Sequence, residues 1–214
     1  MSKADQGQTK SLTVLLPAGR LPRPILARVQ ELAQHYEFDL YLSTVQNLRL
    51  INIKAADLEE IKTRLAEVGA DFKGPGKFPL PKVCVGKPHC TTGIADTEEL
   101  SRRILARFGQ RTGVKPKFKI AVAGCPLSCS GALLADIGII ATRKGYDIYA
   151  GGKAGPNPKL GRRIVREAGE EQVLEVIGRL VDFHDAKTGK KQRLRKLLDD
   201  PEFPFQENES CRRV

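Results

Sequence analysis

Four of the five cysteines fall in two spaced pairs, and they are the residues best suited to chemistry. Cys84 and Cys90 are separated by five residues, and Cys125 and Cys129 by three. Such pairs more often hold a metal or a cluster than form disulfides in a chain large enough to be stable without them. Cys211 has no partner at a suggestive spacing, so we expect a free thiol there.

Three kinds of site could use these thiols. Structural zinc sites pair their ligands through about two to four intervening residues. The Cys125–Cys129 spacing fits this range, whereas the Cys84–Cys90 spacing is too long. A cubane iron–sulfur cluster takes thiolates from separate loops, and small neighbouring residues let backbone amides approach its sulfurs. The pattern therefore favours a cluster over zinc, with a disulfide pair third.

Apolar periodicity predicts a β-α-β-β-α unit over residues 11–72, which is typical of a ferredoxin-like half domain. Its predicted strands and helices cover residues 13–16, 22–35, 39–44, 48–53 and 56–68. Residues 1–10 are polar, without the apolar stretch of a signal peptide, and predict a disordered tail. Residues 73–82 hold five Gly or Pro in ten positions and predict a domain boundary.

Residues 80–185 predict a second, α/β domain, so the whole chain is expected to be α+β. Its predicted elements are a helix behind Asp96, strands over 117–123, 137–141 and 147–150, and a helix over 171–184. Residues 186–214 are expected to form a basic C-terminal tail. Within it, the stretch 187–196 has six cations and no acid, which favours a solvated segment.

The composition narrows the function classes. The chain has 36 basic and 25 acidic side chains, a formal net charge of +11, and this excess favours an anionic partner. Aromatic residues make up 6% and there is no Trp, which disfavours a base-stacking nucleic-acid surface. No apolar run is long enough to span a membrane. We therefore expect a cytoplasmic globular protein that does not enter membranes.

Several segments resemble the sirohaem- and 4Fe–4S-binding domain of sulfite and nitrite reductases. They are Cys84–Cys90, Lys117–Cys129, Asp136–Gly138 and the glycine-rich run Ile148–Gly155. The N-terminal unit is similar to the ferredoxin-like half domain of the same family at Leu16–Arg20 and Leu42–Gln46. The resemblance covers roughly residues 12–183.

The resemblance implies two cofactors, a 4Fe–4S cluster and sirohaem. In the family, four cysteines ligate the cluster, and these match Cys84, Cys90, Cys125 and Cys129. The last of them also bridges to the sirohaem iron, so Cys129 would be the shared thiolate. The implied activity is an oxidoreductase that reduces sulfite or nitrite with electrons passed from the cluster to the sirohaem. Sirohaem is rich in carboxylates, which agrees with the basic composition.

Lys117 and Lys119 are the candidate anion-binding residues. Residues two apart on a strand share a face, so both ammonium groups would project opposite Phe118. The resemblance adds that a Lys-x-Lys pair of this kind lines the substrate anion pocket of the family. A strand with one solvated face would explain the same pattern.

The sequence also departs from the family at three arginines. The first strand has none, Val45 stands where an arginine is usual, and none shortly precedes Cys84. These departures keep open a second interpretation, a sirohaem and 4Fe–4S electron-transfer protein or non-catalytic subunit. A metal-stapled nucleic-acid module is a third and more remote one. Expected partners are sulfite or nitrite, an electron-donor protein, and a second copy or partner subunit, because larger family members hold two copies of this domain pair.

Overall fold

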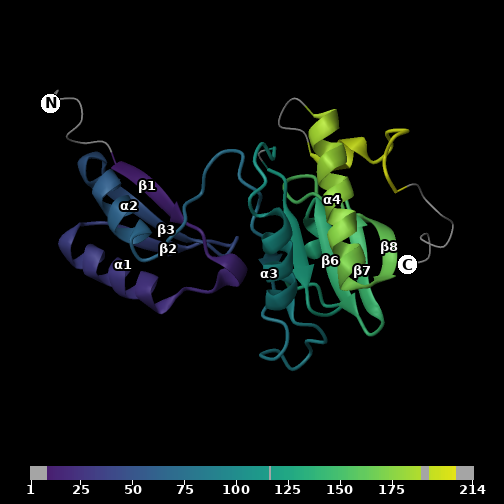
Figure 1. Cartoon of the computed structure of the whole chain (residues 1–214), viewed down its shortest axis with the longest axis horizontal. Coiled ribbons are helices and arrows are strands. Elements are labelled where there is room, and N and C mark those ends of the chain that lie inside the picture. The colour runs from purple at the N-terminus through teal and green to yellow at the C-terminus, as the bar shows by residue number, and fades with distance from the viewer. Residues whose placement is uncertain (1–8, 116, 189–192, 206–214) are drawn as a thin grey trace. The chain divides into compact units, whose positions relative to one another are not determined.

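The structure is a computed structural model that describes residues 9–115, 117–188 and 193–205 (Figure 1). It divides into two compact units, Met1–Gly74 and Pro75–Val214. Both units contain helices and sheet, which confirms the α+β class. Within the described residues, no helix has the length and apolar character needed to cross a membrane.

The first unit is a three-stranded antiparallel sheet with two helices packed against it (Figure 1). Its elements are β1 (Thr9–Val14), α1 (Arg23–His35), β2 (Asp39–Leu42), β3 (Leu48–Lys54) and α2 (Leu58–Ala66). The sheet order is β1-β3-β2, so the central strand is the third in the chain. This arrangement confirms the predicted β-α-β-β-α half domain.

Local sequence explains where the first unit's helices begin and end. Pro24 lies in the first turn of α1. Backbone N–H groups in a first turn have no acceptor within the helix, so proline costs no hydrogen bond there. Ile25, Val29 and Leu32 then recur on one face and are buried in the core. Gly69 follows α2 with a φ of 84°, a left-handed conformation that glycine adopts without strain.

Strand β1 begins at Thr9, earlier than the predicted start at Thr13. The predicted tail over residues 1–10 is therefore wrong for Thr9 and Lys10, which both pair with β3. Their side chains are exposed, so the strand is held there by backbone pairing that no hydrophobic pattern reveals. Residues 1–8 lie outside the described residues.

The second unit is a five-stranded mixed sheet in the order β4-β5-β6-β7-β8. Its elements are β4 (Lys82–Val83), α3 (Thr97–Phe108), β5 (Ile120–Ala123), β6 (Ile137–Thr142), β7 (Gly145–Ala150), β8 (Arg162–Ala168) and α4 (Glu170–Lys187). Strands β4, β5 and β6 are parallel, and β7 and β8 continue the sheet antiparallel. The structure adds β8, a strand with three arginines that the sequence pattern did not predict.

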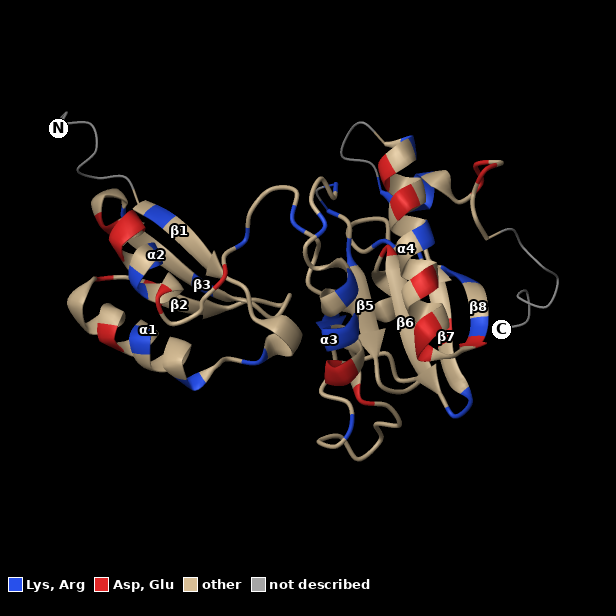
Figure 2. Ribbon diagram, in the orientation of Figure 1, with Lys and Arg blue, Asp and Glu red and all other residues tan. Residues whose placement is uncertain are grey.

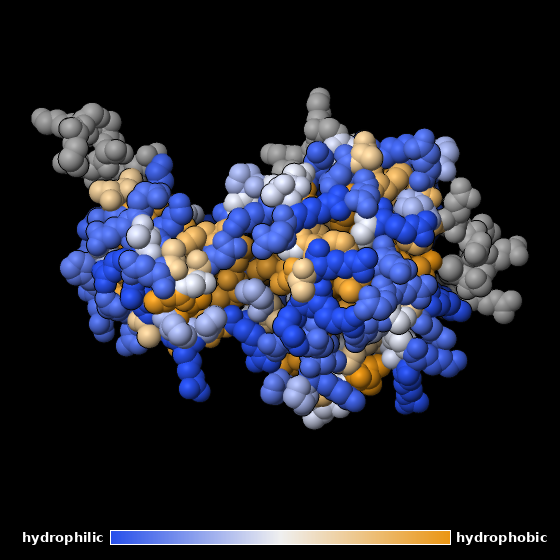
Figure 3. Space-filling model, in the orientation of Figure 1, coloured by the Kyte–Doolittle hydropathy of each residue, from blue (hydrophilic) through white to orange (hydrophobic). Residues whose placement is uncertain are grey.

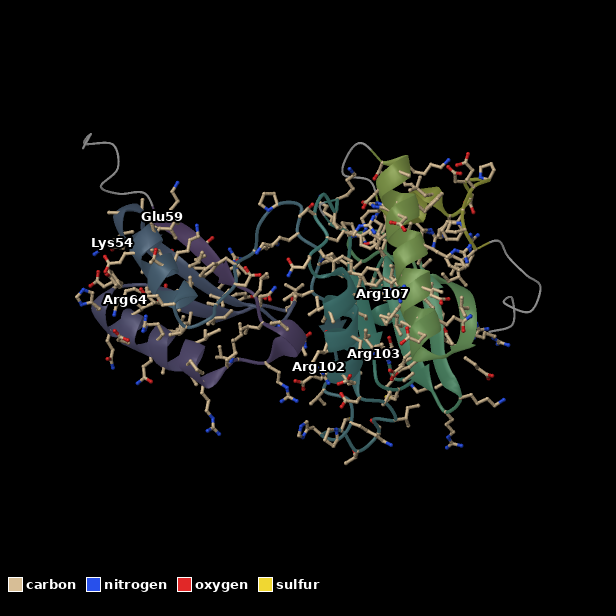
Figure 4. All side chains as sticks on the ribbon, viewed as in Figure 1. Lys54, Glu59, Arg64, Arg102, Arg103 and Arg107 are labelled. Atoms are coloured by element: carbon tan, nitrogen blue, oxygen red, sulfur yellow. The ribbon has the colours of Figure 1, made fainter. Side chains whose placement is uncertain are left out.

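One face of this sheet presents large aliphatic side chains to the two helices. The buried residues of this face are Ile120, Val122, Ile137, Ile139 and Ile148. Helix α3 begins at the predicted cap, where the Asp96 carboxylate accepts the Glu99 N–H at 2.9 Å. Arg103 forms ion pairs with Glu170 and Glu171 of α4, and Figure 4 labels Arg103 on α3. Figure 2 shows both basic and acidic positions on these two helices. Most side chains visible on the unit's surface are hydrophilic (Figure 3).

The opposite face of the sheet is lined by small residues. Ala121 and Ala123 pack there against the short 3-10 turn Ala132–Leu134. A Cβ on Gly138 would come within 2.2 Å of the Ala132 carbonyl oxygen, so no side chain fits between them. Parallel strands are usually connected by a helix. Here the small residues let the connection from β5 to β6 lie flat on the sheet instead.

The predicted C-terminal tail is wrong over the residues that the structure describes. Helix α4 continues to Lys187, and a 3-10 turn forms over Leu194–Leu197. Leu194, Leu197 and Phe203 are buried. Leu194 lies between two arginines of this stretch, and Leu197 and Phe203 follow it, so a segment that was expected in solvent packs on the domain instead.

Candidate functional site

The first cysteine pair lies on the loop that follows β4. Cys84 extends the parallel pairing, because its N–H donates to the Val122 carbonyl at 3.2 Å. The loop then folds on itself, and the Cys90 N–H donates to the Gly86 carbonyl at 2.8 Å. The Lys87 N–H donates to the Ala95 carbonyl at 2.9 Å, which closes the base of the loop.

The second pair lies on the turn that follows β5. Cys125 comes two residues after the end of the strand and is 7% exposed. The chain turns between it and Cys129 through Ser128, whose N–H donates to the Cys125 carbonyl at 3.2 Å and whose φ is 52°. Because β4 and β5 are parallel neighbours, both cysteine segments leave from the same, carboxyl edge of the sheet.

Gly124 joins the two cysteine segments. Its N–H donates to the Cys84 Sγ at 3.1 Å, and its carbonyl accepts the Ile94 N–H at 2.8 Å. A Cβ here would lie 3.1 Å from the Gly86 Cα and from the Thr97 side chain. The close approach therefore depends on glycine, as the small residues beside Cys125 predicted, and it brings a backbone amide to a ligand-type sulfur.

Thr92 lies between thiols of the two segments. Its Oγ1 is 3.3 Å from the Cys90 Sγ and 4.0 Å from the Cys125 Sγ. The hydrogen bond from Thr92 lowers the pKa of Cys90, which favours the thiolate. No sequence motif pointed to this residue. The structure thus shows Cys84, Cys90 and Cys125 linked through Gly124 and Thr92, with Cys129 exposed on the same turn.

The four cysteines are free thiols, while Cys211 lies outside the described residues. Among the residues that the structure describes, no three His, Cys, Asp or Glu side chains converge on the position of a single metal ion. A cubane cluster places its own irons and sulfides between its ligands, so its thiolates lie farther apart than those around one ion. Thiols on two linked loops with an N–H directed at sulfur fit such a cluster.

Three exposed apolar side chains lie in the two cysteine segments. Val85 follows Cys84, Ile94 ends the first loop, and Leu127, which is 68% exposed, lies between Cys125 and Cys129. Leu127, two residues before the exposed Cys129, offers an apolar surface that the flat face of a macrocycle such as sirohaem could cover.

The two candidate lysines lie elsewhere. Strand β5 begins at Ile120, and Lys117 has a φ of 74°, so the expectation that both lysines share one strand is wrong. Both are nevertheless exposed on either side of the buried Phe118. They stand at the amino end of β5, and at about 3.3 Å per residue Lys119 is roughly 16 Å along the strand from Gly124. The structure does not bring the lysines to the cysteines.

Two family models match the chain. The model of the nitrite and sulphite reductase 4Fe-4S domain matches residues 80–202, which is more than half of the chain. The model of the nitrite/sulfite reductase ferredoxin-like half domain matches residues 3–68. The chain belongs to the nitrite and sulfite reductase family. Residue roles within this family member, including the cysteine ligand set, remain predictions.

Curated relatives are nitrite and sulfite reductases. The chain is 27% identical over 201 residues to a nitrite reductase [NAD(P)H] of Emericella nidulans, covering 93% of this chain and 18% of that protein. It is 30% identical to the nitrite reductase (NADH) large subunit of Escherichia coli, of which it covers 23%. An assimilatory-type sulfite reductase of Nitratidesulfovibrio vulgaris is 25% identical, with 89% of this chain and 87% of that protein covered.

Solved structures show the same fold. The Mycobacterium tuberculosis NirA protein matches with a TM-score of 0.72 and 20% identity, covering 91% of this chain and 38% of that one. Dissimilatory sulfite reductase I matches with a TM-score of 0.76 and 14% identity, covering 92% and 67%. The family fold is therefore present, and the chain is much shorter than most of the relatives named here.

Proposed function

We propose that this chain is a sirohaem- and 4Fe–4S-dependent reductase of sulfite or nitrite. The observation that carries the proposal is the pairing of two cysteine segments at one edge of the sheet, joined by the Gly124 N–H on the Cys84 Sγ. Membership of the family and the names of the relatives support the reaction class.

Cys84, Cys90, Cys125 and Cys129 are the proposed cluster ligands. When bound, the cluster and the sirohaem supply low-potential electrons and an iron at which an oxyanion can be reduced. The chain's part is to hold the thiolates: Thr92 favours the ionised form of Cys90, and the Gly124 amide donates to Cys84. Such donors offset negative charge on sulfur and so affect the potential of a cluster.

Cys129 is the proposed link between the two cofactors. It is the exposed thiol of the four, and Leu127 beside it is exposed as well. A thiolate shared between two cofactors needs access from both sides, and an aliphatic neighbour can cover the face of a macrocycle and exclude water there.

Lys117 and Lys119 are the proposed source of positive charge for the substrate anion. Cations near an oxyanion can stabilise the charge that develops as bonds to oxygen break. Since these lysines stand at the opposite edge from Cys125, we place them in a pocket completed by a second copy or a partner subunit. An electron-donor protein and a cytoplasmic location belong to the same proposal.

A sirohaem and 4Fe–4S electron-transfer protein or non-catalytic subunit is the second candidate. The observation that favours it is the absence of the family's arginines, since Val45 is an exposed aliphatic residue that supplies no donor.

Anaerobic turnover with reduced methyl viologen decides between the candidates. We expect the protein with full cluster and sirohaem occupancy to reduce sulfite or nitrite, and Cys129→Ser to abolish that turnover. Occupancy is checked by iron, acid-labile sulfide and the red absorption band of sirohaem. A fully loaded protein that reduces neither anion would reject the reductase and leave the electron-transfer protein or non-catalytic subunit.

A further inference from the structure

The C-terminal segment 193–199 packs against the amino edge of the five-stranded sheet, which is the edge at which β5 and β6 begin. Figure 1 shows this segment in yellow beyond the end of α4. Leu194 and Leu197 bury their side chains in the domain and so anchor the segment. Arg193, at its start, reaches a carboxylate that stands far away in the sequence.

That carboxylate is Asp136, directly before β6, and it is fully buried. Its Oδ1 accepts the Arg193 Nε–H at 2.8 Å and the Leu194 N–H at 3.3 Å. Its Oδ2 accepts the Lys119 N–H at 3.0 Å. Burial raises the pKa of Asp136, and the Arg193 guanidinium opposes that rise by favouring the carboxylate. One buried charge thus ties the start of β5 to the C-terminal segment.

The same segment holds both ends of the glycine-rich loop 151–161. The Arg193 Nη2 donates to the Gly152 carbonyl at 3.0 Å, and the Arg195 Nη1 donates to the Leu160 carbonyl at 2.9 Å. Within the loop, the Lys153 and Lys159 backbones exchange two hydrogen bonds of 2.8 Å. The loop is a closed hairpin whose two arms are fixed by two arginines from one segment.

We propose that Arg193 is a positioning residue. Through Asp136 it holds the backbone of Lys119, and through Gly152 it holds the glycine-rich loop, so that these cationic segments keep fixed positions at one edge of the sheet. This inference rests on the proposed function in assigning Lys119 to an anion site. Arg193 has two separate donor directions, one toward the Asp136 carboxylate and one toward the loop. A lysine could satisfy only one of them, because its ammonium is a single point charge.

Backbone hydrogen exchange of Arg193→Gln tests the proposal without any cofactor. We expect the Lys119, Lys153 and Lys159 amides to exchange about tenfold faster, the ratio for one lost charge-assisted hydrogen bond. The first unit should be unchanged. Arg179→Gln is the matched control, because Arg179 donates to the Pro204 carbonyl at 2.9 Å and so contacts the same C-terminal region without touching Asp136.

Anion kinetics of the loaded protein provide the second measurement. In Arg193→Gln we expect the KM for the anion to rise about tenfold with a smaller change in kcat, and Arg193→Lys to recover part of the loss. If Arg193→Gln does not fold, Arg193→Lys carries both measurements, with a smaller increase in exchange expected at the loop amides.

Two results would overturn the proposal. One is unchanged exchange at the three amides, and the other is faster exchange spread evenly over the second unit, which would make Arg193 a general stabiliser. A loaded wild-type protein without turnover would instead reject the proposed function. Faster exchange confined to the three amides in Arg193→Gln would still support the positioning role of Arg193.

Discussion

The two edges of the five-stranded sheet carry different groups and are held together in different ways. At the carboxyl edge, the cysteine segments are joined by the backbone of Gly124, which donates to the Cys84 Sγ and accepts the Ile94 N–H. At the amino edge, Lys119 and the glycine-rich loop are joined by the side chains of Asp136 and Arg193. The first edge is organised mainly by hydrogen bonds of backbone groups, whereas the second depends on a buried ion pair.

This difference predicts how each edge responds to change. Backbone pairing tolerates surface substitutions but is sensitive to any side chain added at a close approach. A buried carboxylate is sensitive to loss of its cation, because an unpaired buried charge is costly. Changes at one edge should therefore leave the other edge largely intact, and the following variants test that independence.

The largest effect is expected from Cys125→Ser. This substitution removes a buried thiol that we propose as a cluster ligand, so it should abolish cluster binding, as measured by iron and acid-labile sulfide. Hydrogen exchange at Lys119 should stay unchanged, because the amino edge has its own supports. Cys211→Ser is the control and should leave the iron content at the wild-type level. Stoichiometric zinc without sulfide in the wild-type protein would contradict the cluster.

Gly124→Val should also reduce the iron content strongly. The added side chain would meet Gly86 and Thr97, so the first cysteine loop would have to move away from Cys125. We expect less than about half of the wild-type iron per chain, since overpacking of this kind forces the backbone to shift. Gly169→Ala is the matched control, because a Cβ at Gly169 meets nothing within 4 Å. Wild-type iron in Gly124→Val would show that cluster binding does not need the close approach at Gly124.

Replacing either Lys117 or Lys119 by Ala should weaken anion binding by about one to two orders of magnitude, since a charge-assisted contact contributes about 1.5–3 kcal/mol. The cluster and sirohaem spectra should persist, because these lysines stand away from the cysteines. Titration of the loaded protein with sulfite, nitrite and cyanide measures the effect. Lys62→Ala in α2 is the control. Wild-type affinity for all three anions would remove the lysines from the site.

Leu127→Ser should lower sirohaem affinity by up to about tenfold, because part of an exposed leucine would be covered by the macrocycle. The thermal midpoint of the cofactor-free protein should hardly change, since Leu127 is already 68% exposed. Leu26→Ser is the control, a leucine 51% exposed in the first unit, and should change neither quantity. A loss of thermal stability with unchanged sirohaem affinity would mean that Leu127 has a structural role only.

The smallest effect is expected from Thr92→Val. Loss of the hydroxyl 3.3 Å from the Cys90 Sγ should shift the midpoint potential of the cluster to a more negative value, because hydrogen bonds to sulfur stabilise the reduced, more negative state. A redox titration followed by absorption or EPR measures the shift. Thr91→Val is the control, as the neighbouring threonine. Identical potentials in wild type and Thr92→Val would show that this contact does not influence the cluster.

Local pattern was enough to predict the first unit and the cysteine segments. The periodic burial of Ile25, Val29 and Leu32 is a property of consecutive turns, so it is visible in the sequence. The cysteine spacings are equally local, and parallel strands bring the two segments to one edge. Small residues beside Cys125 correctly indicated close amide approach to sulfur. The burial period and the cysteine spacings depend on neighbours in the chain, whereas the meeting of the two cysteine segments depends on the pairing of β4 with β5.

The amino edge could not be predicted in this way. Asp136 and Arg193 are 57 residues apart, and Arg193 lies in a run of cations that looks like a solvated tail. Lys117 and Lys119 alternate with Phe118 as if in a strand, yet a left-handed residue ends that pattern. The Asp136 carboxylate is buried, and the Arg193 guanidinium pairs with its charge, because two distant segments meet in three dimensions. Because composition and periodicity record only local order, this half of the candidate site became visible only in the folded chain.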